Sequence, residues 1–157
     1  MALSALVKKL LFARQFEIDN GRVNMLGMRK VIISPDVISE LCSTDSKTVY
    51  KAAKSALKKD TSHLKDDMGV TGKQLLDFSI QLLEAYGVGN LQLINIELKS
   101  KRAMFIVNDS VFAKKGGCGF TAGALAGVLS VMFDSDVDVK ETMCASKADH
   151  CQFEVKP

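Results

Sequence analysis

Aromatic side chains are scarce in this sequence, which has no tryptophan and only 6% aromatic residues. A platform that stacks the bases of single-stranded nucleic acid needs several exposed rings beside basic side chains, and this composition does not supply them. The net charge is only +3, from 21 basic and 18 acidic residues, and the lysines are spread along the chain. A nucleic-acid-binding protein usually gathers its basic residues on one face. We therefore expect no direct contact with nucleic acid.

No apolar run approaches the length of about 20 residues that is needed to span a bilayer as a helix. Residues 1–13 (MALSALVKKLLFA) are apolar, but Lys8 and Lys9 lie inside the run. A signal peptide instead carries its positive charge before the apolar core and small residues after it. We interpret residues 1–13 as an amphipathic arm that packs on this protein or on a second copy. The expected location is the cytoplasm, without membrane contact.

Catalytic signatures are also missing from the sequence. It contains no serine nucleophile elbow, no glycine-rich phosphate loop and no dinucleotide-binding fingerprint. Hydrophobic residues make up 47% and charged residues 25%, as in a globular protein. A length of 157 residues favours one domain over residues 1–157.

The order of expected elements predicts the fold class. Asn20-Gly21 is a hairpin turn between strands at 15–18 and 23–26, because this pair allows positive φ at both turn positions. A third strand is expected at 30–33. Ser34-Pro35-Asp36 is a typical helix start, and Thr71 with Gln74 forms a capping-box pattern before a helix that ends at Gly87. The expected helices cover 35–42, 46–59, 71–86 and 122–133, and the later strands cover 91–98, 102–108, 137–142 and 152–155. Strands and helices that are segregated in this way predict an α+β fold, with an antiparallel sheet on which the helices pack.

Gly123 and Gly127 form a GxxxG pattern on the helix expected at 122–133. This helix is too short for a membrane span. The pattern therefore predicts a close approach to a neighbouring helix or to the sheet.

Three of the four cysteines lie in the last forty residues, at Cys118, Cys144 and Cys151, and Glu141 lies among them. The helix after Cys118 carries the chain roughly 20 Å, and the following strand returns by a similar distance. Glu141 can therefore reach Cys118. Cys144 and Cys151 lie at the two ends of a tight connection between strands. This pattern predicts that the four side chains meet.

Three thiolates and one carboxylate suit the four tetrahedral positions of zinc, and no position then remains open for water or substrate. Such a zinc would be structural, worth on the order of 10 kcal/mol to folding. Residues 118–157 would form the metal-site segment. Four lysines near it in sequence could offset the excess negative charge, namely Lys114, Lys115, Lys140 and Lys147. Spacing alone leaves two alternatives open: inert buried thiols, or a redox pair of Cys144 with Cys151.

Residues 118–127 (CGFTAGALAG), 137–144 (VDVKETMC) and 151–155 (CQFEV) resemble the vinyl-4-reductase domain family. The resemblance implies an α+β ligand-binding fold shared with subunits of transport particles (TRAPP). Its members include sensory domains of aromatic-responsive transcription activators and proteins of the tetrapyrrole vinyl reductase group. In the sensory members one Glu and three Cys bind zinc beside a hydrophobic pocket. These ligands fall on Cys118, Glu141, Cys144 and Cys151.

The sequence departs from the family pattern in the loop at residues 145–150 (ASKADH). This loop lacks the glycine that is common in the family and is one residue shorter. The departure leaves His150 as an alternative ligand.

Three functional hypotheses follow. The first is a sensory or binding domain that holds a small hydrophobic or aromatic molecule, forms a homodimer and acts through partner proteins. The second is a subunit of an enzyme related to tetrapyrrole vinyl reduction, although no redox-cofactor fingerprint is present. The third is a protein-assembly module without a ligand. Candidates to line a pocket are the aromatic residues Tyr86, Phe105, Phe120, Phe133 and Phe153.

Overall fold

The computed structural model describes residues 15–113 and 118–156. Its contacts divide the chain into two compact units, residues 1–34 and 35–157. Each unit is described by itself, and the assignment of residues 1–157 to a single domain stays a prediction. The arm expected at residues 1–13 lies outside the described residues. In the described ranges, no helix combines the length and the apolar character that crossing a membrane requires.

The first unit contains a three-stranded antiparallel sheet of β1 (Phe16–Asp19), β2 (Arg22–Met25) and β3 (Met28–Lys30). Asn20 and Gly21 both have positive φ, at 47° and 74°, which confirms the predicted hairpin turn.

The third strand begins and ends earlier than predicted. A second tight turn, with positive φ at Leu26 and Gly27, pairs Met25 with Met28. The strand therefore ends at Lys30, and the strand predicted over 30–33 is wrong. The apolar residues 31–33 lie outside any strand and are exposed.

The second unit begins with α2 (Pro35–Asp66), which contains a break at Asp45. The φ and ψ of Asp45, −147° and 77°, are not helical. Its carboxylate accepts hydrogen bonds from the backbone N–H of Thr48 at 3.0 Å and from the Thr48 hydroxyl at 2.6 Å, as an N-cap does. The two helices that the sequence predicted are thus two segments of α2. The second segment passes the predicted end at Lys59, because Thr61 and Leu64 continue its buried face.

Helix α3 (Gly72–Ala85) begins after Thr71 and ends before Gly87, as expected. The predicted capping box is wrong, because the Thr71 side chain makes no capping hydrogen bond. Gly72 has a φ of +56°, so the backbone enters α3 through a left-handed residue rather than a regular first turn. The N-terminus of α3 consequently has no side-chain cap.

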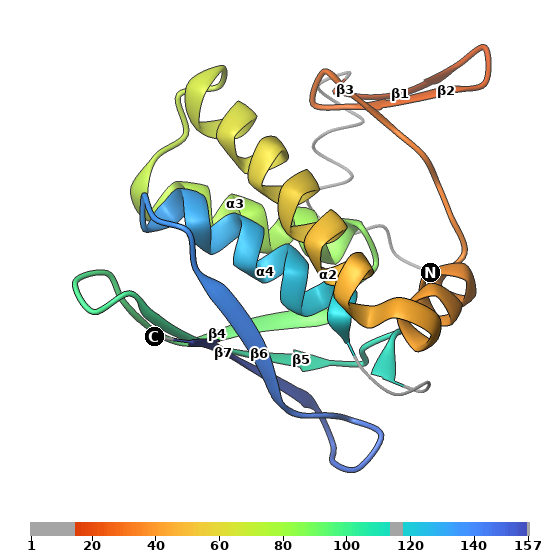
Figure 1. The fold of residues 1–157 in the computed structure, drawn as a ribbon. Coiled ribbons are helices and arrows are strands. Elements are labelled where there is room, and N and C mark those ends of the chain that lie inside the picture. Colours follow the sequence, from red (N-terminus) through yellow and green to blue (C-terminus); the bar gives the residue numbers. More distant parts are fainter. Residues whose placement is uncertain (1–14, 114–117, 157) are drawn as a thin grey trace. The chain divides into compact units, whose positions relative to one another are not determined.

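The sheet of the second unit contains β4 (Asn90–Glu97), β5 (Arg102–Asn108), β6 (Asp138–Met143) and β7 (Cys151–Lys156). Its order is β4-β5-β7-β6, and every neighbouring pair is antiparallel. The helices of this unit lie on one face of the sheet (Figure 1). This architecture confirms the predicted α+β class. Two β-bulges interrupt the register, near Ile94 in β4 and near Thr142 in β6.

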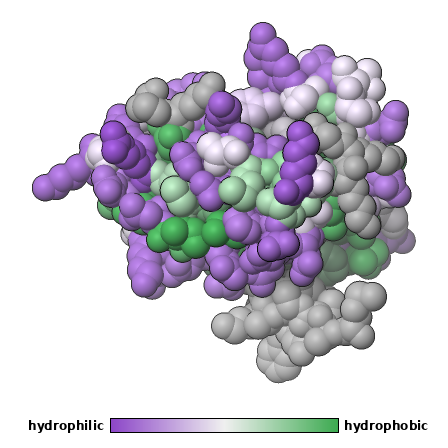
Figure 2. Space-filling view, turned by 90° about the horizontal axis from the view of Figure 1, so that it is seen from below, coloured by the Kyte–Doolittle hydropathy of each residue, from purple (hydrophilic) through white to green (hydrophobic). Residues whose placement is uncertain are grey.

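The other face of this sheet is amphipathic. Phe105 of β5 points to the helices and is buried, so its neighbours Met104 and Ile106 point the opposite way and are half-buried. The exposed Ile94 lies at the bulge of β4. Figure 2, viewed from below Figure 1, shows hydrophobic side chains among hydrophilic ones on this side of the molecule.

Helix α4 (Gly119–Met132) is the central helix of the second unit, and residues 121–130 are all buried. It starts three residues before the predicted 122. An added Cβ would lie 2.2 Å from the Tyr50 carbonyl oxygen at Gly123, and 2.5 Å from the Lys54 carbonyl oxygen at Gly127. Both glycines thus let α4 touch the backbone of α2, which confirms the predicted close approach.

The Tyr50 hydroxyl links α2 to β6. It donates a hydrogen bond to Asp138 at 2.9 Å and accepts one from the backbone N–H of Val139 at 3.0 Å. Burial raises the pKa of this hydroxyl, so it remains a donor near neutral pH. Lys54 adds ion pairs to Asp136 and Asp138, at 3.2 and 2.8 Å. These contacts hold the edge strand against the outer helix.

We expect Tyr50→Phe to lower the free energy of unfolding by about 1–2 kcal/mol, because the Val139 N–H loses its partner. Urea unfolding followed by circular dichroism measures this difference. A loss below about 0.5 kcal/mol would contradict the assigned role, since a net hydrogen bond is worth more than that.

Candidate metal centre

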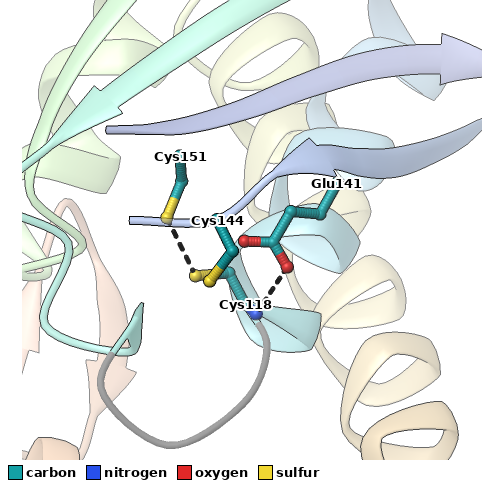
Figure 3. Close-up of side chains that lie close together, drawn as sticks. All are labelled: Cys118, Glu141, Cys144 and Cys151. Carbon is teal, nitrogen blue, oxygen red and sulfur yellow. Dashed lines mark hydrogen bonds between the residues drawn. The ribbon is translucent and has the colours of Figure 1, made fainter. Parts of the chain in front are cut away.

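The four candidate ligands come from three places in the chain and meet at one end of the sheet. Cys118 immediately precedes α4, Glu141 lies on β6, Cys144 follows β6, and Cys151 opens β7. One ligand atom from each of the four lies within 4.8 Å of the others (Figure 3). The structure therefore brings together the residues that the sequence selected.

The bulge in β6 explains how Glu141 and Cys144 share a face. Side chains alternate along a strand, so residues three positions apart normally point to opposite faces. Glu141 pairs with Phe153, but Met143 pairs with Gln152, so Thr142 is an extra residue in β6. The extra residue shifts the alternation by one position. Cys144 consequently turns toward the same side as Glu141.

The sulfur atoms are spaced as a tetrahedral zinc requires. The Sγ atoms of Cys118 and Cys151 lie 3.5 Å apart. Sulfurs bound to one tetrahedral zinc, at about 2.3 Å each, would lie about 3.8 Å apart. The structure shows no disulfide between them, since both cysteines are free.

Polar groups around the sulfurs provide further support for a metal. The backbone N–H of Ala145 donates to Cys151 Sγ at 3.3 Å, and the Ser146 hydroxyl donates to Cys144 Sγ at 3.3 Å. The Ser110 hydroxyl lies 3.5 Å from Cys118 Sγ. Such contacts orient metal-bound thiolates and disperse their charge. The N–H groups that the sequence suggested for this role, near residues 116 and 117, lie outside the described residues.

One carboxylate oxygen of Glu141 is left for a ligand bond. Its Oε2 accepts a hydrogen bond from the backbone N–H of Cys118 at 3.1 Å. Its Oε1 is buried and has no hydrogen-bond partner. An unpaired buried carboxylate oxygen costs free energy, and a cation among the four ligand atoms would satisfy it. The donor set and this orphaned oxygen both fit a metal.

Burial makes the centre unfavourable for thiolates without a cation. The side chains of Cys118 and Cys151 are fully buried. Desolvation raises the pKa of both thiols, and the nearby Glu141 charge raises them further. A divalent cation reverses this effect, because it binds the thiolate directly.

The centre has one side near solvent. Glu141, Cys144 and Lys147 border a surface cavity of about 430 Å³. Lys147 is therefore placed to offset excess negative charge, whereas Lys140 is exposed on β6. The two other lysines suggested from sequence, at 114 and 115, lie outside the described residues.

The remaining candidate ligands do not join this group. His150 is half-buried and is not a member of the cluster. Cys42 is buried on α2 and is not a member either.

The aromatic residues proposed to line a pocket are mostly part of the core. Phe105 and Phe153 are almost fully buried, and Phe133 is buried near the end of α4. A different cavity, of about 440 Å³, lies where α3, β4 and the C-terminal end of α4 meet. Its apolar wall is aliphatic and includes Leu75, Leu76, Leu93, Ile96, Leu98, Val131 and Met132. Sequence reasoning missed this cavity because it looked for aromatic side chains.

Comparisons with known proteins agree with this fold and this segment. Residues 104–157 match the family model of the vinyl-4-reductase domain. The crystal structure of the phenol-responsive sensory domain of the transcription activator PoxR with phenol superimposes with a TM-score of 0.77 at 16% sequence identity, over 98% of this chain and 90% of that chain. A vinyl-4-reductase family protein from Methanocaldococcus jannaschii gives a TM-score of 0.51 at 21% identity, over 76% of this chain and 74% of that chain. A comparison with curated proteins finds no match.

At these identities the two structures establish the fold, and the family match rests on residues 104–157. Those residues contain β5, α4, β6 and β7 and all four candidate ligands. The last third of the chain is therefore a vinyl-4-reductase domain segment within the fold that these two structures share, which confirms the resemblance to the vinyl-4-reductase domain family.

Proposed function

We propose that this chain is a metal-stabilised sensory or binding domain for a small hydrophobic or aromatic molecule. The observation that carries the metal assignment is the meeting of three sulfurs and one orphaned carboxylate oxygen in a single buried cluster. Zinc is the proposed ion, since it favours tetrahedral sites rich in thiolate.

The proposed metal has a structural role. Cys118, Glu141, Cys144 and Cys151 would fill all four positions of a tetrahedral zinc, so none remains for a substrate. When bound, zinc would supply a cross-link between the start of α4 and the connection from β6 to β7. The residues themselves position the ligand atoms through the β6 bulge and the Cys118–Glu141 hydrogen bond.

The sensory role is supported by the similarity of almost the whole chain to the phenol-responsive domain of PoxR. The aliphatic cavity of about 440 Å³ provides further support, because small-molecule pockets of about 300–1,000 Å³ with mostly apolar walls are usual. Partner proteins would read the bound state. The homodimer and the cytoplasmic location expected from the sequence remain predictions.

Elemental analysis tests the metal assignment. We expect about one zinc per chain in the purified protein, and a large loss of zinc in Cys144→Ser. Cys42→Ser is the matched control, because it makes the same chemical change at a buried cysteine outside the cluster. Full zinc occupancy in Cys144→Ser would exclude Cys144 as a ligand.

Native mass spectrometry of protein purified from its host cells tests the ligand assignment. A co-purified small apolar molecule would support the sensory function. A tetrapyrrole that is turned over would instead support the enzyme-subunit hypothesis. Protein that is always empty, and that binds no small apolar molecule when titrated, would favour an assembly module.

A further inference from the structure

The aliphatic cavity lies far from the candidate metal centre. Val131 and Met132 line the cavity at the last residues of α4, whereas Cys118 precedes the first residue of the same helix. The 14 residues of α4 separate the two sites by about 20 Å. A molecule in the cavity would therefore not contact the metal ligands.

The rim of the cavity carries unpaired positive charge. Lys65, near the end of α2, and Lys73, in the first turn of α3, both line it and are exposed. Within the part of the chain that the structure describes, neither lysine takes part in an ion pair or hydrogen bond. Asp77 is the one acidic residue in the lining, so the lining has a net charge of +1.

The backbone at the rim also favours an anion. Thr71 and Gly72 line the cavity at the N-terminus of α3, where no side chain caps the helix. The free N–H groups at such a terminus point along the positive end of the helix dipole. The two lysines and this terminus surround the mouth of an otherwise aliphatic cavity.

From this arrangement we propose that the cavity is the ligand site, and that its ligand is an apolar molecule with one anionic group, such as an aryl alkanoate. The proposal rests on the proposed sensory function and names its site and ligand class. The apolar part contacts the aliphatic wall formed by Leu75, Leu93 and Met132, and the carboxylate lies at the rim between Lys65 and Lys73. Phenol, the ligand in the PoxR structure, is uncharged near neutral pH and would leave both lysines unused.

Isothermal titration calorimetry with the zinc-loaded full chain tests this proposal. The probes are 3-phenylpropanoate and its uncharged analogue 3-phenylpropanamide, which have the same apolar part. We expect the acid to bind more tightly than the amide. Lys65→Gln and Lys73→Gln should each weaken acid binding up to about fivefold, as for an exposed charge pair, and should leave amide binding unchanged.

A pair of matched variants tests the location. Leu98 lines the cavity and is 61% exposed, so Leu98→Asp places a negative charge at the rim without disturbing the core. Ile94 is 51% exposed and lies outside the cavity lining. We expect Leu98→Asp to weaken acid binding more than either lysine variant does, and Ile94→Asp to leave it unchanged.

Several outcomes would overturn the inference. Equal binding of acid and amide would overturn the ligand class, and equal effects of Leu98→Asp and Ile94→Asp would overturn the location. Failure of both probes to bind at millimolar concentration would overturn both. The sensory function would survive each of these results if native mass spectrometry finds a small neutral apolar ligand, so the two failures can be distinguished.

Discussion

Replacement of Gly123 by alanine should lower the free energy of unfolding by about 3 kcal/mol, as expected for severe overpacking. The new Cβ would lie 2.2 Å from the Tyr50 carbonyl oxygen and 2.9 Å from its carbonyl carbon. These are backbone atoms of α2, so relief requires the two helices to move apart. The higher helix propensity of alanine, about 1 kcal/mol, is too small to compensate. Chemical denaturation of wild type and variant measures the difference.

Gly119 provides the control for this prediction. A Cβ there would lie 2.5 Å from Ser46 Oγ, which belongs to a flexible side chain, and 3.2 Å from the Ser46 carbonyl oxygen. The double variant Gly119→Ala with Ser46→Ala removes the closest atom, so we expect it to stay within about 1 kcal/mol of wild type. If Gly123→Ala is as stable as this double variant, the close contact of α4 with α2 is not essential.

Removal of the proposed zinc should have the largest effect on stability. We expect a loss on the order of 5 kcal/mol, less than for zinc-finger peptides because this chain has a core of its own. For a chain of this size the loss corresponds to a fall in Tm of about 10–20 °C. Thermal unfolding followed by circular dichroism, before and after treatment with a chelator, measures this change, and zinc should restore the original Tm.

Hydrogen exchange would locate the destabilised region. After chelation, the first turn of α4 and the ends of β6 and β7 near the cluster should exchange faster, because the cross-link holds these elements together. The edge strand β4 lies at the other side of the sheet and serves as an internal reference. An unchanged Tm, with zinc loss verified by elemental analysis, would refute the structural role of the metal.

Local sequence patterns predicted much of the secondary structure. Asn20-Gly21 forms the expected turn, and Gly87 follows the expected end of α3, because both depend on the backbone freedom of the residues present. Strand β5 has the predicted bounds. The predictions at residues 30–33 and for the Thr71 capping box were wrong. In both places a nearby residue with positive φ, Gly27 or Gly72, redirects the chain, and the sequence pattern did not reveal it.

The candidate metal centre shows the same division. The residue types and spacing of Cys118, Glu141, Cys144 and Cys151 selected the ligands. The alternation of a regular strand, however, would have placed Glu141 and Cys144 on opposite faces. Only the pairing of β6 with β7 creates the bulge at Thr142 that brings them together.

The sequence by itself determined the α+β class, the tight packing at Gly123 and the identity of the four candidate ligands. These depend on residue type, on periodicity and on spacing, which are properties of the chain alone. Tertiary structure decided the insertion of β7 between β5 and β6, the bulge in β6 and the cavity at the end of α4. Each of these arises from contacts between residues distant in sequence, whose free energies outweigh local preference and leave no mark on any single segment.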